Sequence, residues 1–114
     1  MSATAMAILH FNAIPIFCDI DERTYNIDVS KVEALITPRT KAILSVDIFG
    51  QSADTNQLNR IAAKHNIKVI SDTAQAITAK RDSKFAGTLT DIGGYSLNRH
   101  KHINTGEGGI VVTN

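Results

Sequence analysis

Four polar residues in the second half of the chain have side chains that suit one kind of chemistry. Asp72 and Gln75 stand three residues apart after an apolar run, and Ser96 and Lys101 stand five residues apart at the end of another. A lysine amine condenses with an aldehyde to form a Schiff base, and a carboxylate keeps a pyridine nitrogen protonated. With each residue near a strand end, the four side chains predict a binding site for pyridoxal phosphate (PLP).

The neighbours of Lys101 are basic. Arg99, His100 and His102 place positive charge in the same predicted loop, where it would attract an anionic ligand. Taken alone, Lys101 reads as an ordinary surface lysine, so the prediction depends on the other three residues. The two histidines have no third residue at a zinc-ligand spacing, and we predict no metal site.

Two other segments have a plain structural interpretation beside a functional one. The glycine-rich residues 105–109 lack the spacing of a dinucleotide-binding loop and lead into an apolar strand, so we interpret them as a tight turn. Asp19 and Asp21 have the side chains of metal ligands, but they lie in a polar, turn-rich segment that a solvated loop explains.

The composition argues against several classes of protein. The chain has 114 residues, 43% hydrophobic and 20% charged, which fits one small globular domain. A net charge of +1 and the absence of Trp do not favour nucleic acid or an anionic membrane as partner. Cys18 is the only cysteine and lies in an apolar run, where we expect buried filler and no disulfide. Residues 2–9 resemble neither a signal peptide nor a membrane span, and we expect a cytoplasmic protein.

The order of the predicted elements indicates an α/β fold. Helices are expected at residues 3–10, 28–36 and 55–65, and strands at 14–18, 42–46, 67–71, 92–97 and 109–113. Asp28 and Asp54 are suitable N-caps, and Asn66 is a suitable C-cap. Residues 73–77 are typical of one helical turn, and residues 80–87 of a polar surface ribbon. Helices that alternate with apolar strands predict a mainly parallel sheet with helices on both faces.

The combination of motifs resembles the nucleotide-sugar aminotransferases of the DegT/StrS type. Gln75 after Asp72, Ser96 before Lys101, and the Thr-Gly-Glu-Gly-Gly that follows match that family in order. Earlier segments match it too, at residues 13–21, 24–28, 36–42 and 49–54. The resemblance covers the whole chain.

This resemblance implies a fold, a cofactor and a reaction. The family has the aspartate-aminotransferase-like fold (fold type I), works as a homodimer and uses PLP. By motif position, Lys101 resembles the Schiff-base lysine and Asp72 the partner of the pyridine nitrogen. Gln75 resembles the amide near the ring hydroxyl, and Ser96 a phosphate ligand. The implied reaction moves an amino group, usually from glutamate, to a keto group of a nucleotide-linked sugar, as in polysaccharide biosynthesis.

The chain departs from the family pattern in three respects. Asn12 stands where a glycine is usual, and Asp47 stands where a histidine is common. Family members are also several times longer. We therefore expect residues 1–114 to be a partial PLP-binding large domain, without the N-terminal segment and the C-terminal domain. Met1 stands where the family has an aromatic that stacks on the cofactor ring.

Two alternatives stay open on the sequence. One is a PLP-dependent dehydratase of the same family, which needs no covalent lysine. Such members carry histidine at the position of Lys101, so the lysine argues against this alternative. The other is a non-catalytic remnant that binds nothing, because motifs survive truncation.

Overall fold

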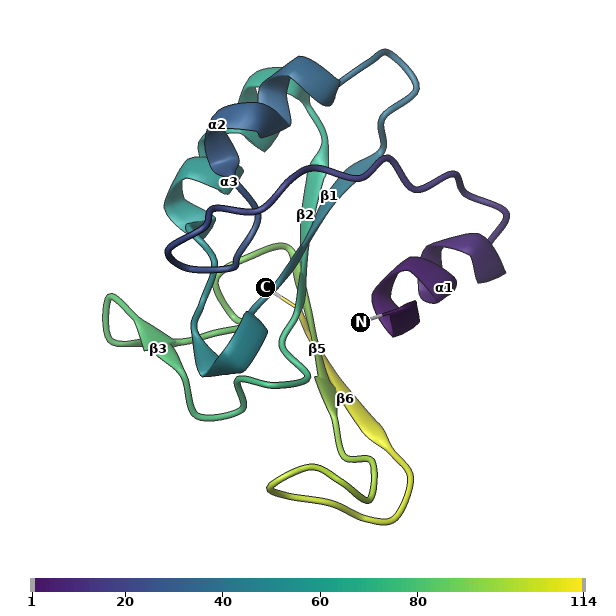
Figure 1. Cartoon of the computed structure of the whole chain (residues 1–114), viewed down its shortest axis with the longest axis vertical. Helices are drawn as coiled ribbons and strands as arrows, with labels where there is room; N and C mark the ends of the chain where they lie inside the picture. Colours follow the sequence, from purple (N-terminus) through teal and green to yellow (C-terminus); the bar gives the residue numbers. More distant parts are fainter. Residues whose placement is uncertain (1, 114) are drawn as a thin grey trace.

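A four-stranded sheet forms the centre of the molecule. The computed structural model describes residues 2–113, so the prediction about Met1 lies outside the described residues. The strands are β1 (Ala42–Val46), β2 (Lys68–Asp72), β5 (Ile92–Ser96) and β6 (Gly109–Thr113), in the order β1-β2-β5-β6. β1, β2 and β5 are parallel, and β6 runs antiparallel to β5 (Figure 1). The predicted mainly parallel sheet is confirmed.

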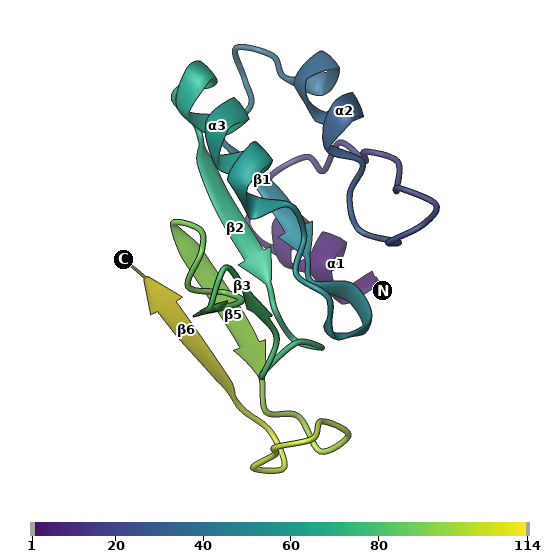
Figure 2. The same cartoon turned by 90° about the vertical axis from the view of Figure 1, so that its left-hand side faces the viewer.

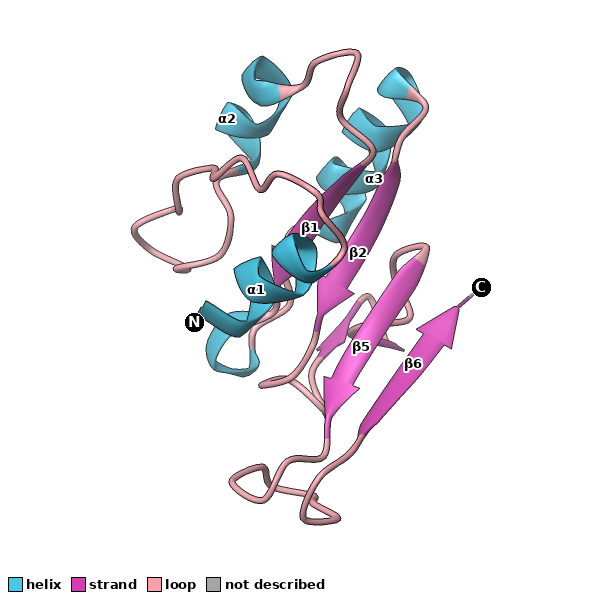
Figure 3. Cartoon of the chain, turned by 90° about the vertical axis from the view of Figure 1, so that its right-hand side faces the viewer, coloured by secondary structure: helices cyan, strands magenta, loops and turns pink. Residues whose placement is uncertain are grey.

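Helices lie on both faces of this sheet, as predicted. α2 (Val29–Val32), which continues into a 3-10 turn, packs beside α3 (Thr55–His65) on one face (Figure 2). α1 (Ser2–His10) crosses the other face, in front of β1 and β2 in Figure 3. Within residues 2–113, no helix is long and apolar enough to cross a membrane.

Capping side chains set the ends of these helices. Asp28 accepts a hydrogen bond from the Ser30 N–H at the start of α2, and Asp54 accepts one from the Gln57 N–H at the start of α3. Asn66 ends α3 in the left-handed conformation, with φ 53°. All three caps agree with the sequence-based predictions.

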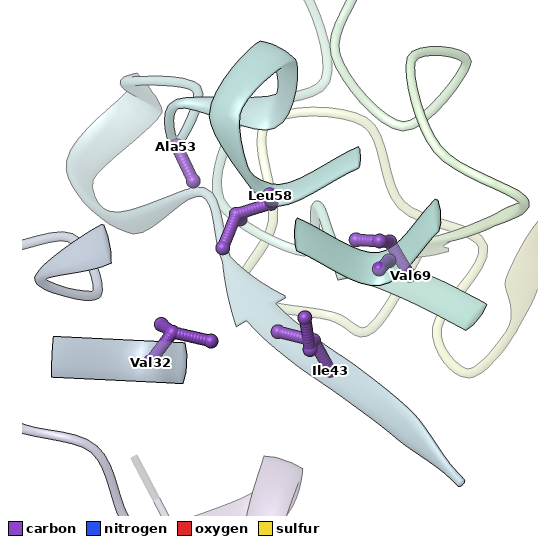
Figure 4. Close-up of a cluster of buried hydrophobic side chains, with 6 residues drawn as sticks. Val32, Ile43, Ala53, Leu58 and Val69 are labelled. Atoms are coloured by element: carbon purple, nitrogen blue, oxygen red, sulfur yellow. The ribbon is translucent and has the colours of Figure 1, made fainter. Parts of the chain in front are cut away.

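The hydrophobic core lies between α3 and the sheet. Its buried members are Val32, Ile43, Ala53, Leu58, Ala62 and Val69 (Figure 4). Cys18 is half-buried against this cluster, so the expectation that it is filler agrees with its place. Burying a side chain such as Leu58 stabilises the fold by roughly 1.5–3 kcal/mol. We call the face of the sheet under α3 the covered face.

The opposite face of the sheet, crossed by α1, is much less buried, and we call it the open face. α1 buries none of its residues. Residues 14–18 were expected to form a buried strand, but they pair with no strand, and Ile14 and Phe17 are 81% and 77% exposed. The prediction was wrong because an apolar run forms a strand only where a partner strand offers hydrogen bonds.

The segment between β2 and β5 contains no helix. Residues 73–77 form turns rather than the predicted helical turn. The polar ribbon at 80–87 is a short antiparallel hairpin of β3 (Lys80–Arg81) and β4 (Lys84–Phe85), as expected in outline. The loop after the hairpin lies against β5, where a Cβ on Gly93 would come 2.1 Å from the Gly87 carbonyl oxygen. Only glycine permits this close approach.

Candidate functional site

Asp72 and Ser96 end two neighbouring parallel strands at the same edge of the sheet. Asp72 is the last residue of β2 and pairs with Gly94 of β5, and Ser96 lies two residues further along β5. Side chains alternate between faces along a strand, so Asp72, Gly94 and Ser96 belong to one face. Val69 and Ser71 of β2 are buried on the covered face, which places Asp72 and Ser96 on the open face.

Both oxygens of the Asp72 carboxylate accept hydrogen bonds. Oδ1 accepts one from the Ala74 N–H at 3.1 Å, within its own loop. Oδ2 accepts one from the Thr4 hydroxyl of α1 at 2.6 Å. Each carboxylate oxygen has two lone pairs, so one acceptor position on each oxygen is left for a ligand N–H. A pyridinium nitrogen is a donor of that kind.

Gln75 is held by the loop that follows β1. Its side-chain oxygen accepts a hydrogen bond from the Phe49 N–H at 3.1 Å. Phe49 has a left-handed backbone with φ 54°, and its ring lies edge-on to Tyr25, which has φ 59°. Both aromatic rings are largely exposed. Bulky residues rarely adopt the left-handed backbone conformation because it is strained. Residues with strained backbones are found more often at functional sites than elsewhere.

Lys101 lies in a closed loop that begins directly after Ser96. The Leu97 N–H donates to the Gly108 carbonyl, and the Thr105 N–H donates back to the Leu97 carbonyl. The Lys101 N–H donates to the Asn98 carbonyl at 2.8 Å, and the Lys101 side chain is half-buried. The loop thus returns to the end of β5, and Lys101 lies five residues after Ser96 within it.

The expected turn and the basic character of this loop are both present. Gly106 and Gly108 have positive φ angles of 84° and 155°, and β6 follows at once. Arg99, His100 and His102 are exposed around Lys101. Within residues 2–113, no group of three or more His, Cys, Asp or Glu side chains is arranged to hold a metal ion.

Asp47 lies beneath this edge, and sequence reasoning assigned it no role. Its side chain is fully buried; one oxygen accepts from the Ala53 N–H at 2.9 Å and the other from the Thr73 hydroxyl at 2.8 Å. Its own N–H donates to the Asp72 carbonyl at 2.9 Å. Burial raises the pKa of Asp47, although the Ala53 N–H bond opposes this. Asp47 therefore joins the loops that carry Phe49 and Gln75.

Asn26 supports the same arrangement from a third segment. It is buried, donates to the Gln51 carbonyl, and accepts from the Ile48 N–H. A polar residue just before an N-cap in the sequence gives no sign of such a role. Asp47 comes directly after β1 in the sequence, and that position is the signal that could have indicated its role.

A concave surface lies at the opposite end of these strands. It is lined by residues 36–38, 40–41 and 65–67, which precede β1 and β2. It is therefore at the amino ends of these strands, opposite the edge that carries Asp72. The identity of the candidate site at the carboxyl edge rests on the chemistry of its side chains.

The α/β sheet, with Asp72 and Ser96 at the carboxyl ends of adjacent parallel strands, is the architecture of a class of enzymes to which known proteins connect this chain. The model of the DegT/DnrJ/EryC1/StrS aminotransferase family matches residues 1–114. This chain belongs to that family.

Three similar proteins illustrate the match. GDP-perosamine synthase from Caulobacter vibrioides is 44% identical over 112 residues, which are 98% of this chain and 30% of that protein. The structure of DesI in the presence of its TDP-sugar product has a TM-score of 0.96 and 36% identity, covering 99% of this chain and 29% of DesI. The structure of NtdA from Bacillus subtilis with bound cofactor PMP has a TM-score of 0.89 and 37% identity, covering 99% of this chain and 25% of NtdA. The chain thus spans about 30% of the length of the curated relative.

Proposed function

We propose that this chain is the central part of the PLP-binding large domain of a sugar aminotransferase. The enzyme would transfer an amino group, in our expectation from glutamate, to a keto group of a nucleotide-linked sugar. The observation that carries the proposal is the placement of Asp72 and Ser96 on one face at the carboxyl ends of adjacent strands, with Lys101 in the loop that follows. Relatives named for GDP- and TDP-sugars support the substrate class.

The side chains at this edge fit PLP. When bound, PLP supplies an aldehyde that condenses with an amine and a ring that withdraws electrons from the bond to be broken. Asp72 would accept the ring N–H and keep that nitrogen charged. The Ser96 oxygen accepts the Asn98 N–H at 3.3 Å, which leaves the hydroxyl proton to donate to a phosphate oxygen.

Lys101 and Gln75 would complete the site. The Lys101 amine would form the covalent attachment, and once freed it would take a proton from, or return one to, the substrate carbon that bears the amino group. Gln75 would lie beside the ring hydroxyl, because the Phe49 N–H holds its side-chain oxygen in place. Arg99, His100 and His102 would attract the phosphate groups of the cofactor and the nucleotide.

Exposed apolar side chains support the view that further segments complete the enzyme. Beyond α1 in the chain, the apolar residues Phe11, Ile14 and Phe17 are 83%, 81% and 77% exposed. Apolar patches of this kind mark surfaces that other chain segments or subunits cover. We therefore infer that other parts of the large domain or a second subunit cover these side chains, and we propose a homodimer in the cytoplasm, as the resemblance to the family implies. The chimera described next separates this proposal from a non-catalytic remnant.

A chimera tests the catalytic proposal. Residues 1–114 replace the matching segment of Caulobacter vibrioides GDP-perosamine synthase, and formation of GDP-perosamine is assayed. We expect measurable turnover, its complete loss with Lys101→Ala, and normal turnover with the hairpin variant Lys84→Ala as control. Asp72→Asn should retain the cofactor but react slowly, since the ring nitrogen would lose its charged partner.

The attachment residue is tested on the chain itself. The chain has seven lysines, and borohydride reduction after addition of PLP traps whichever of them carries the cofactor. We expect peptide mapping to find the label mainly on Lys101. Equal labelling of all seven, together with full turnover by a Lys101→Ala chimera, would show that the assignment is wrong.

A further inference from the structure

The hydroxyl of Thr4 is placed to control the orientation of Asp72. The two residues lie 68 positions apart, and the Thr4 Oγ1 to Asp72 Oδ2 distance is 2.6 Å. A carboxylate only accepts hydrogen bonds, so the hydroxyl is the donor. Hydrogen bonds to an ionised group are shorter and stronger than neutral ones, and this distance is in their range.

A second contact is needed to fix the orientation of the Asp72 carboxylate plane. The terminal torsion of an aspartate is broad, so the Ala74 N–H bond to Oδ1 leaves the carboxylate free to rotate. The Thr4 bond to Oδ2 comes from a different element and removes this freedom. The two contacts use one lone pair on each oxygen and leave the others for a ring N–H.

The same bond is a direct tie between α1 and the sheet. α1 buries no side chain, so packing against the sheet contributes little to its position. Thr4 is half-buried where α1 crosses the open face. Anything that strengthens the Thr4–Asp72 contact therefore also holds α1 in place.

We propose that Thr4 is a positioning residue, which aims the Asp72 carboxylate at the ring nitrogen of PLP and couples cofactor binding to the docking of α1. The proposal rests on the function proposed above. Coupling of this kind is reciprocal, so a bound cofactor must stabilise α1 by as much as docked α1 strengthens cofactor binding.

Three variants of the chain test the hydroxyl. Thr4→Val keeps the shape of the side chain without the donor, and Thr4→Ser keeps the donor. Thr88→Val is the control: it removes a hydroxyl from the loop after the hairpin, where that hydroxyl donates to the Phe85 carbonyl. Affinity for PLP is measured from the absorbance change on titration. We expect Thr4→Val to bind about tenfold more weakly and the other two to bind within about twofold of the original chain.

Amide hydrogen exchange of α1 gives a second readout that needs no catalysis. Without PLP, exchange in residues 2–10 should be faster in Thr4→Val than in Thr4→Ser. Addition of PLP should slow this exchange in the original chain and in Thr4→Ser, and much less in Thr4→Val. Equal exchange in both variants, with and without PLP, would overturn the proposal.

A double-mutant cycle separates positioning from a general effect on folding. If Thr4 acts through Asp72, Thr4→Val should have no further effect on PLP affinity in an Asp72→Asn background. A further tenfold loss in that background, or equal losses for Thr4→Val and Thr4→Ser, would show that Thr4 acts by packing.

The two proposals fail in different ways. A chain in which Lys101→Ala leaves PLP attachment unchanged contradicts the proposed function. A chain in which Lys101→Ala abolishes attachment while Thr4→Val binds PLP normally contradicts only the role of Thr4.

Discussion

The two faces of the sheet differ in how they are held. On the covered face, six buried apolar side chains join α3, α2 and the strands, and the loop after the hairpin closes on Gly93. On the open face, α1 buries no residue and is tied to Asp72 through the Thr4 hydroxyl. Apolar burial stabilises one face, whereas directional polar contacts arrange the other.

The candidate site lies on the less buried face. Asp72 and Ser96 belong to the open face, while Asp47 and Thr73 form a buried polar contact beneath the same edge. A cofactor can reach only a surface that the chain has not already filled. The packed face therefore acts as the rigid support, and the open face carries the groups that would meet a ligand.

The largest effect should come from the core of the covered face. We expect Leu58→Ala to lower the free energy of unfolding by about 2–5 kcal/mol, because Leu58 is fully buried and its loss leaves a cavity. Phe17→Ala, at a side chain that is largely exposed, should change it by less than about 0.5 kcal/mol. Urea unfolding followed by circular dichroism measures both, and similar losses would contradict the contrast between buried and exposed side chains.

Two adjacent glycines of β5 offer a finer comparison. Gly93→Ala should destabilise the chain by about 1–3 kcal/mol, because the new Cβ would meet the Gly87 backbone at 2.1 Å. Gly94 faces the open side, where the nearest atom to an added Cβ is the Ser71 carbonyl oxygen at 4.0 Å. Gly94→Ala should therefore be neutral or slightly stabilising in the same unfolding experiment. Equal destabilisation by both variants would show that the faces do not differ here.

The smallest effect should be a pH dependence from Asp47. Burial raises the pKa of this carboxyl in the folded chain, so the folded state holds the proton more tightly than the unfolded state. Its contribution to stability then falls as pH rises from the ordinary aspartate range through the raised value. We expect the stability of Asp47→Asn relative to the original chain to increase over that window.

Asp91 provides a control of opposite sign for this experiment. The Lys68 side chain and the Val69 N–H lower the pKa of Asp91, so its contribution is present above the ordinary value and is lost at lower pH. Asp91→Asn should therefore lose stability relative to the original chain as pH rises, by a small amount because the group is exposed. Thermal unfolding between pH 3 and 8 compares the variants, and parallel curves would refute the expected signs.

Local signals were sufficient for most elements of the fold. Periodic apolar residues predicted α3, and the strands of the sheet were placed within one residue, because a side-chain pattern and its caps act over a few neighbouring positions. Residues 14–18 show where this reasoning fails. Their composition suits a strand, but whether a strand forms depends on a partner that local sequence does not encode.

The sequence by itself determined which chemical groups stand near strand ends: the Asp72 carboxylate, the Gln75 amide, the Ser96 hydroxyl and the Lys101 amine. Only the tertiary structure decided which face Asp72 and Ser96 share, because strand order and register set that. It also brought Thr4 to Asp72 across 68 residues and buried Asp47 under the Thr73 hydroxyl. Contacts between distant segments have no period or spacing in the sequence, since they form only when the chain closes around its core.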